Sequence, residues 1–188
     1  GFTPRMIARM EEYIRRAAVK IVDEAAPLGA CDFVTKVAAE LPLVVIADIM
    51  GIPQEDRHKV FDWSNRLIGF DDPEFQNTLE DATKAAAEMW MYANGLAADR
   101  KGKEDKDLVT VLINAKIDGD QLTEMEFDAF FLMLAVAGNE TTRNLISGGM
   151  LALMENPAQR QRLLADPALL PTAVEEMLRW VTPVIHFR

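Results

Sequence analysis

A long, almost wholly apolar stretch of the sequence, residues 127–154, is interrupted near its middle by a short polar segment. A helix that is apolar on all sides belongs in the core of a protein. The polar segment reads Ala-Gly-Asn-Glu-Thr-Thr and covers residues 137–142. An unpaired polar side chain at such a depth costs roughly 1–3 kcal/mol. The sequence therefore predicts a core helix whose polar segment is kept for a functional reason.

The residue types of this segment suit a ligand groove. Gly138 costs about 1 kcal/mol relative to alanine inside a helix, but its missing side chain lets a bulky group approach the backbone. Thr141 can bond back to the carbonyl of Ala137 and weaken the helix locally. With the carboxylate of Glu140, these residues can line a groove for a flat ligand with a reactive, water-accessible centre. A kinked helix with internally satisfied polar groups fits the same spacing, so spacing alone leaves both interpretations open.

Composition excludes several classes of protein. The 188 residues carry a net charge of −10 and are 49% hydrophobic. Disorder is therefore excluded, and so are nucleic-acid binding and docking on anionic lipid, which need clustered Lys and Arg. The longest apolar run, 129–138, is far below the ~20 residues of a membrane span, and no signal peptide is visible. The single cysteine, Cys31, rules out an internal disulfide, so we expect a cytoplasmic protein.

Periodicity and capping signals predict a mainly α fold with minor β structure. Apolar residues recur at three- and four-residue steps through most of the chain. Asp118-Gly119 between apolar residues predicts a small β hairpin at 117–122. The apolar run after Thr182-Pro183 predicts the start of a β strand at 184–187. The predicted helices cover residues 4–25, 41–50, 53–69, 75–96, 108–115, 123–155 and 172–181, and a capping box at Thr123-Glu124-Met125-Glu126 opens the sixth. A further short helix is expected from Asp32, and a short strand remains possible at 41–50.

A second motif, Glu-x-x-Arg, lies in the last predicted helix. Glu176 and Arg179 are three residues apart and share one helical face. The neighbouring Val174, Leu178 and Val181 indicate partial burial of this pair. The motif is common in helices, so alone it says little.

The two motifs together, followed by Thr-Pro and an apolar strand, resemble those of the cytochrome P450 haem-thiolate monooxygenases. The resemblance extends over essentially the whole chain and implies the D to K helices of that fold. On this basis residues 1–188 are an incomplete single domain, a fragment without the C helix and the haem-ligand loop. Residues 137–144 and 183–185 most resemble bacterial enzymes that hydroxylate terminal methyl groups of branched lipids and of steroid side chains.

The resemblance also implies roles for the polar segment. Glu140 and Thr141 would be catalytic, holding water and delivering protons during oxygen activation. The helix would cross one face of haem b, whose chemistry the protein only orients. Haem contacts would come from Ala137, Gly138, Thr142 and Arg188.

Other parts of the chain receive roles in the same way. Glu176 and Arg179 would form the structural pair that supports the fold on the opposite side of the haem. Residues 67–75 would form a mobile lid over an apolar substrate, although plain core packing explains them equally well. The substrate-binding strand would contain Val184, Ile185, His186 and Phe187.

The chain departs from the family pattern at the iron ligand. The family's axial thiolate follows the Glu-x-x-Arg helix in a glycine-rich loop, and Cys31 has neither that position nor that context. His58 is expected on the surface, and no metal ligand is assigned. We therefore expect this chain alone to be inactive.

For the parent enzyme we expect electrons from NAD(P)H through a ferredoxin and ferredoxin reductase, no nucleic-acid partner and no transmembrane segment. A terpenoid hydroxylase of the same family, a non-catalytic lipid-binding module and a purely structural helical protein remain alternatives.

Overall fold

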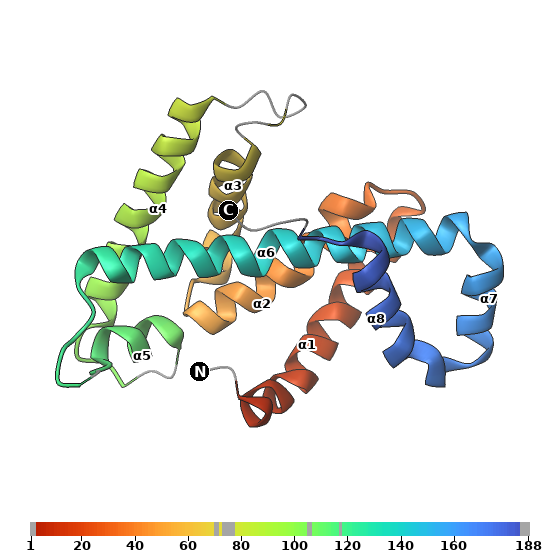
Figure 1. Cartoon of the computed structure of the whole chain (residues 1–188), viewed down its shortest axis with the longest axis horizontal. Helices are drawn as coiled ribbons and strands as arrows, with labels where there is room; N and C mark the ends of the chain where they lie inside the picture. Colours follow the sequence, from red (N-terminus) through yellow and green to blue (C-terminus); the bar gives the residue numbers. More distant parts are fainter. Residues whose placement is uncertain (1–2, 70–71, 73–77, 105–106, 117, 185–188) are drawn as a thin grey trace. The chain divides into compact units, whose positions relative to one another are not determined.

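The computed structural model describes residues 3–69, 72, 78–104, 107–116 and 118–184. The described chain is mainly helical, which confirms the predicted class (Figure 1). Among the described residues, no helix is both long and apolar enough to cross a membrane. The helices are α1 Pro4–Ala25, α2 Glu40–Met50, α3 Arg57–Ile68, α4 Leu79–Arg100, α5 Leu108–Asn114, α6 Glu124–Glu155, α7 Pro157–Ala165 and α8 Leu170–Val181, with short helical turns at Ala26–Leu28, Val34–Ala38, Gln54–Asp56 and Pro167–Leu169.

Local capping chemistry sets where several helices begin. The predicted capping box before α6 is confirmed: the Thr123 amide donates to Glu126 Oε2 at 2.9 Å, and the Glu126 amide donates back to Thr123 Oγ1 at 3.3 Å. Thr78 and Asp81 form a second box at the start of α4. Asp107 accepts from the Thr110 amide at 2.9 Å and so caps α5. Each cap satisfies amides that would otherwise lack a partner at a helix start.

The predicted β hairpin at 117–122 is wrong. Asp118 and Gly119 do make a turn with positive φ angles of 54° and 97°, as a hairpin turn requires. The described residues on either side form no strand. Between the end of α5 at Asn114 and the start of α6 at Glu124, the described residues contain one isolated bridge residue, Asp120, and no strand. Val184 also lies outside any strand, and 185–187, the rest of the predicted strand, lie outside the described residues.

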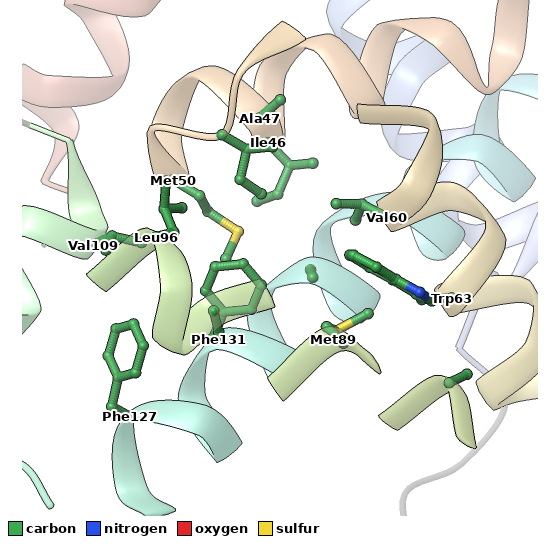
Figure 2. Packing of buried hydrophobic residues seen from close by; sticks show 14 residues of the cluster. Ile46, Ala47, Met50, Val60, Trp63, Met89, Leu96, Val109, Phe127 and Phe131 are labelled. Carbon is green, nitrogen blue, oxygen red and sulfur yellow. The ribbon is translucent and has the colours of Figure 1, made fainter. Parts of the chain in front are cut away.

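The chain divides into two compact units, and residues 43–139 form one of them. Its core is a cluster of buried apolar side chains from α2 to α6, which Figure 2 shows from close by. The rings of Phe127 and Phe131 pack 6.2 Å apart between centroids, and Tyr92 lies 6.5 Å from Phe131. The cluster consists of Ile46, Ala47, Met50, Ile52, Val60, Trp63, Ala85, Met89, Ala93, Leu96, Val109, Phe127, Phe131 and Ala135.

Polar contacts join α3 and α4 beside this core. Glu88 Oε2 accepts from the Trp63 indole at 3.0 Å and from Arg66 at 2.7 Å. The Tyr92 hydroxyl donates to Asp56 Oδ2 at 2.9 Å, just before α3. These hydrogen bonds hold α3 against α4 at two positions along the helices. Part of the predicted lid, 70–71 and 73–75, lies outside the described residues.

The other unit consists of 1–42 and 140–188. Within it, two successive glycines of α6 admit side chains of α8. A Cβ built on Gly148 would lie 2.8 Å from Val181 Cγ1, and one on Gly149 would lie 3.0 Å from Met177 Sδ. These glycines therefore allow α8, the helix that carries Glu176 and Arg179, to pack closely on α6.

Candidate functional site

The polar segment of α6 is intact helix, and its residues differ sharply in burial. Ala137 is exposed and Gly138 is half-buried. A Cβ built on Gly138 would lie 3.0 Å from Cδ1 of Ile46, so the close approach that this glycine permits is made by a side chain of α2. Asn139 is completely buried and Glu140 nearly so.

Glu140 is paired with a residue that the sequence analysis did not single out. Its Oε2 accepts a hydrogen bond from Arg143 Nη2, one helical turn further along. Both side chains keep only 11% of their surface exposed. Oε1 of Glu140 accepts no hydrogen bond from the described residues. Burial raises the pKa of Glu140, and Arg143 opposes that rise by its charge and its hydrogen bond. The site therefore holds a carboxylate whose protonation state burial and a single cation control.

Thr141 and Thr142 are both half-buried. Successive residues of an α-helix point about 100° apart, so Thr141 lies on the face of Ala137 and Glu140 lies to one side of it. Small and hydroxyl side chains thus occupy the accessible face of α6. Glu140 lies at the edge of this face, and its Oε1 has no hydrogen-bond partner among the described residues.

Asn139 is a further polar residue that the sequence analysis missed. Neither Oδ1 nor Nδ2 of this buried amide has a hydrogen-bond partner in the described part of the chain. Leaving such groups unpaired costs roughly 1–3 kcal/mol. Asn139 belongs to the polar segment quoted from the sequence, but its complete burial depends on packing that the segment itself does not show.

Glu176 and Arg179 pair as the second motif predicts. Arg179 Nε and Nη2 donate to the two carboxylate oxygens at 2.7 and 2.6 Å. Their side chains are 59% and 66% exposed, so the partial burial expected from the neighbouring apolar residues is not found. Val174, Leu178 and Trp180 of α8 are exposed as well, whereas Met177 and Val181 are half-buried. Hydrogen bonding and the Arg179 charge lower the pKa of Glu176.

Known proteins resemble this chain along its whole length. The steroid C26-monooxygenase of Rhodococcus jostii is 50% identical over 188 residues, which are 100% of this chain and 39% of that protein. The methyl-branched lipid omega-hydroxylase of Mycobacterium bovis is 41% identical over 192 residues, covering 100% of this chain and 45% of that protein. No protein-family model matches.

A comparison with solved structures also finds cytochrome P450 enzymes. A cytochrome P450 of Mycobacterium marinum, solved in complex with pseudoionone, is 41% identical and superposes with a TM-score of 0.91 over 95% of this chain and 44% of that one. The chain is similar over its whole length to cytochrome P450 enzymes. It spans less than half the length of these curated relatives. The resemblance stated from the two motifs is therefore confirmed.

The described part of the chain holds no cluster of potential metal ligands. No group of three or more His, Cys, Asp or Glu side chains there could hold a metal ion. Cys31 and His58 are both exposed. Ile185, His186, Phe187 and Arg188, to which substrate and haem contacts were assigned, lie outside the described residues, and Val184 is exposed.

A cleft of about 420 Å³ lies between α6, α7 and α8, near the end of α6. Its walls include Gly149, Leu163, Glu176, Met177 and Trp180. Residues 137–142 do not line it. The cleft is therefore a feature of the Glu-x-x-Arg region and not of the polar segment.

Proposed function

We propose that the protein carrying this chain is a haem-dependent monooxygenase that inserts one oxygen atom of O2 into an unactivated C–H bond. Its substrate would be apolar, a branched lipid or a steroid side chain. The observation that carries the proposal is the whole-chain identity, 50% and 41%, to enzymes named for those two reactions.

The accessible face of α6 fits a flat, apolar macrocycle. Ala137 is exposed and small, and Met133, one turn before it, is 52% exposed. A bulky side chain at Ala137 would keep a planar ring away from the helix, whereas a methyl group does not. Haem b, when bound, would supply the redox chemistry that activates dioxygen. In this proposal Ala137, Gly138 and Thr142 form the helix surface beside the ring.

Thr141 and Glu140 would handle protons beside that face. The hydroxyl of Thr141 can both donate and accept a hydrogen bond, so it can hold a water molecule or pass a proton next to Ala137. Glu140 would supply protons through Oε1, the carboxylate oxygen that Arg143 leaves unbonded. A raised pKa suits this task, because a general acid works best when its pKa approaches the operating pH.

The remaining parts of the proposal follow from the family. The axial thiolate would come from outside this chain, since Cys31 is exposed in a loop. Electrons would come from NAD(P)H through a ferredoxin-type partner. Val184 to Phe187 would contact substrate, and Arg188 a haem propionate. Glu176 and Arg179 would stabilise the fold without touching substrate.

The test uses the full-length protein with haem, a ferredoxin and its reductase. It would be given a steroid with an intact branched side chain and, as a matched control, the same steroid nucleus without the side chain. The proposal expects a product with one added oxygen on the terminal carbon of the first compound only, identified by mass spectrometry and NMR. Oxidation of the ring nucleus, or of both compounds equally, would contradict it.

A second candidate is hydroxylation of a terpenoid. The observation that favours it is the solved relative, 41% identical, which was crystallised with pseudoionone. Titration of the full-length protein with pseudoionone and with the branched-chain steroid, followed by the haem absorption shift, would separate the two. Tighter binding and faster turnover of pseudoionone would replace the leading proposal with this one.

A further inference from the structure

The chain contains two Glu-x-x-Arg pairs with the same spacing but opposite surroundings. Glu140 and Arg143 are each 11% exposed, whereas Glu176 and Arg179 are 59% and 66% exposed. The pKa of Glu140 is raised because burial outweighs its cation, and the pKa of Glu176 is lowered because its cation outweighs burial. The same two residue types therefore serve different purposes on α6 and on α8.

An exposed pair of this spacing adds a few tenths of a kcal/mol to a helix. A buried pair stabilises a helix less than its charges suggest, because both ions lose their hydration. The buried cation therefore indicates a need for a fixed, charged partner at Glu140 and not a need for stability.

The geometry shows what the partner does. Arg143 donates to Oε2 of Glu140, and no donor within the described residues reaches Oε1. Ser147 Oγ donates to the carbonyl of Arg143 at 2.8 Å, so the backbone around Arg143 is tied to the next turn. Arg143 is the charged group found to act on Glu140 within the described residues. The carboxylate is thus held from one side, with its other oxygen kept for a different partner.

We propose that Arg143 is the positioning residue of Glu140. It keeps the buried carboxyl able to ionise and directs Oε1 towards the path of proton delivery. This inference rests on the proposed function for the use of the proton, but the pairing itself is independent of haem.

The pairing is tested in the chain itself by following the side-chain carboxyl carbon of Glu140 by NMR through a pH titration. Arg143→Met removes the cation at similar side-chain length and should raise the apparent pKa by about one unit, a tenfold tighter proton. Arg143→Lys keeps the charge and should restore most of the wild-type value. Arg15→Met breaks an exposed Arg–Glu pair on α1 and should leave the Glu140 titration unchanged.

A pKa of Glu140 that stays within about 0.3 units of wild type in Arg143→Met would overturn the inference, since such a change is a small part of what a close cation contributes. If that variant does not fold, the comparison of Arg143→Lys with Arg143→Gln decides in the same way.

The role in catalysis is tested separately in the full-length holoenzyme. The pH at which product formation per NAD(P)H falls by half should move in Arg143→Met in the same direction as the Glu140 pKa. The Glu140→Gln variant should lose that pH dependence. If the pKa moves in the chain but the pH profile of coupling does not, the pairing stands, and the proposed role of Glu140 in proton delivery fails.

Discussion

The carboxylate of Glu140 accepts a hydrogen bond from the guanidinium of Arg143, and this ion pair lies almost buried in the middle of the longest helix. The neighbours of the pair on α6 are uncharged, among them Asn139, Thr141 and Asn144. A charge pair in such surroundings makes the protonation of one carboxyl sensitive to one neighbour. In the exposed pair of Glu176 and Arg179 on α8, the cation outweighs burial and the pKa of Glu176 is lowered instead.

Burial of Glu140 predicts a specific pH dependence of stability. Its pKa in the folded chain is raised above the ordinary value of 4.5, so the folded state binds this proton more tightly than the unfolded state. The contribution of Glu140 to the free energy of unfolding should therefore be largest at low pH. It should fall as pH rises from about 4.5 through the raised pKa, by at most about 1.4 kcal/mol per pH unit.

The measurement compares urea unfolding of the wild-type chain and of Glu140→Gln between pH 4 and 8, the range over which a raised carboxyl pKa would act. The free energy of unfolding of the wild type minus that of the variant should decrease as pH rises through that range and then become constant. A difference that is flat, or that grows with pH, would show that the carboxyl is not buried in the way described.

The hydrogen bonds between α3 and α4 lead to a second prediction. Glu88 accepts hydrogen bonds from both Trp63 and Arg66. Asp62 accepts one from Arg66 alone among the described residues, and its side chain is 63% exposed. Glu88→Ala should therefore lower the urea midpoint clearly more than Asp62→Ala. Hydrogen bonding to Arg66 lowers the pKa of Glu88, so its contribution should be present above the ordinary pKa of 4.5 and be lost as pH falls through the lowered value. Equal shifts of the urea midpoint in the two variants would contradict the role of Glu88 in holding α3 against α4.

Two glycines give opposite predictions for the same change. Gly148→Ala places a Cβ 2.8 Å from Val181, a β-branched residue with little freedom to move, and should destabilise the chain by about 1–3 kcal/mol. A Cβ added at Gly95 of α4 would meet no atom of the other described residues within 4 Å beyond the backbone of its own helix. Gly95→Ala should therefore stabilise the chain by up to about 1 kcal/mol. Urea unfolding of both variants tests the pair. Stabilisation by Gly148→Ala would mean that α8 does not approach α6 as described.

Features that depend on neighbouring residues could be predicted from the sequence. The capping box of Thr123 and Glu126 is such a feature, because its donors and acceptors lie within one turn. The start of α1 at Pro4 follows from a similar local preference. The hairpin prediction failed because a turn depends on adjacent residues, whereas the pairing of strands on either side of it does not.

Features that depend on burial could not be predicted. Glu140-x-x-Arg143 and Glu176-x-x-Arg179 have the same spacing, and only packing makes one pair buried and the other exposed. Asn139 was passed over for the same reason, since nothing local to the motif shows that its amide is fully enclosed. Gly138 was expected to admit a ligand, and the structure places Ile46 against it.

The most direct test of the central claim concerns Thr141 in the full-length holoenzyme. Hydrogen peroxide and hydroxylated product would be measured per NAD(P)H consumed for wild type, Thr141→Ala and Thr141→Ser, with haem content matched between the three. The account predicts that Thr141→Ala releases several-fold more peroxide at the expense of product, and that Thr141→Ser, which keeps the hydroxyl, stays near wild type. Unchanged coupling in Thr141→Ala would contradict the assignment of the polar segment of α6 to proton delivery.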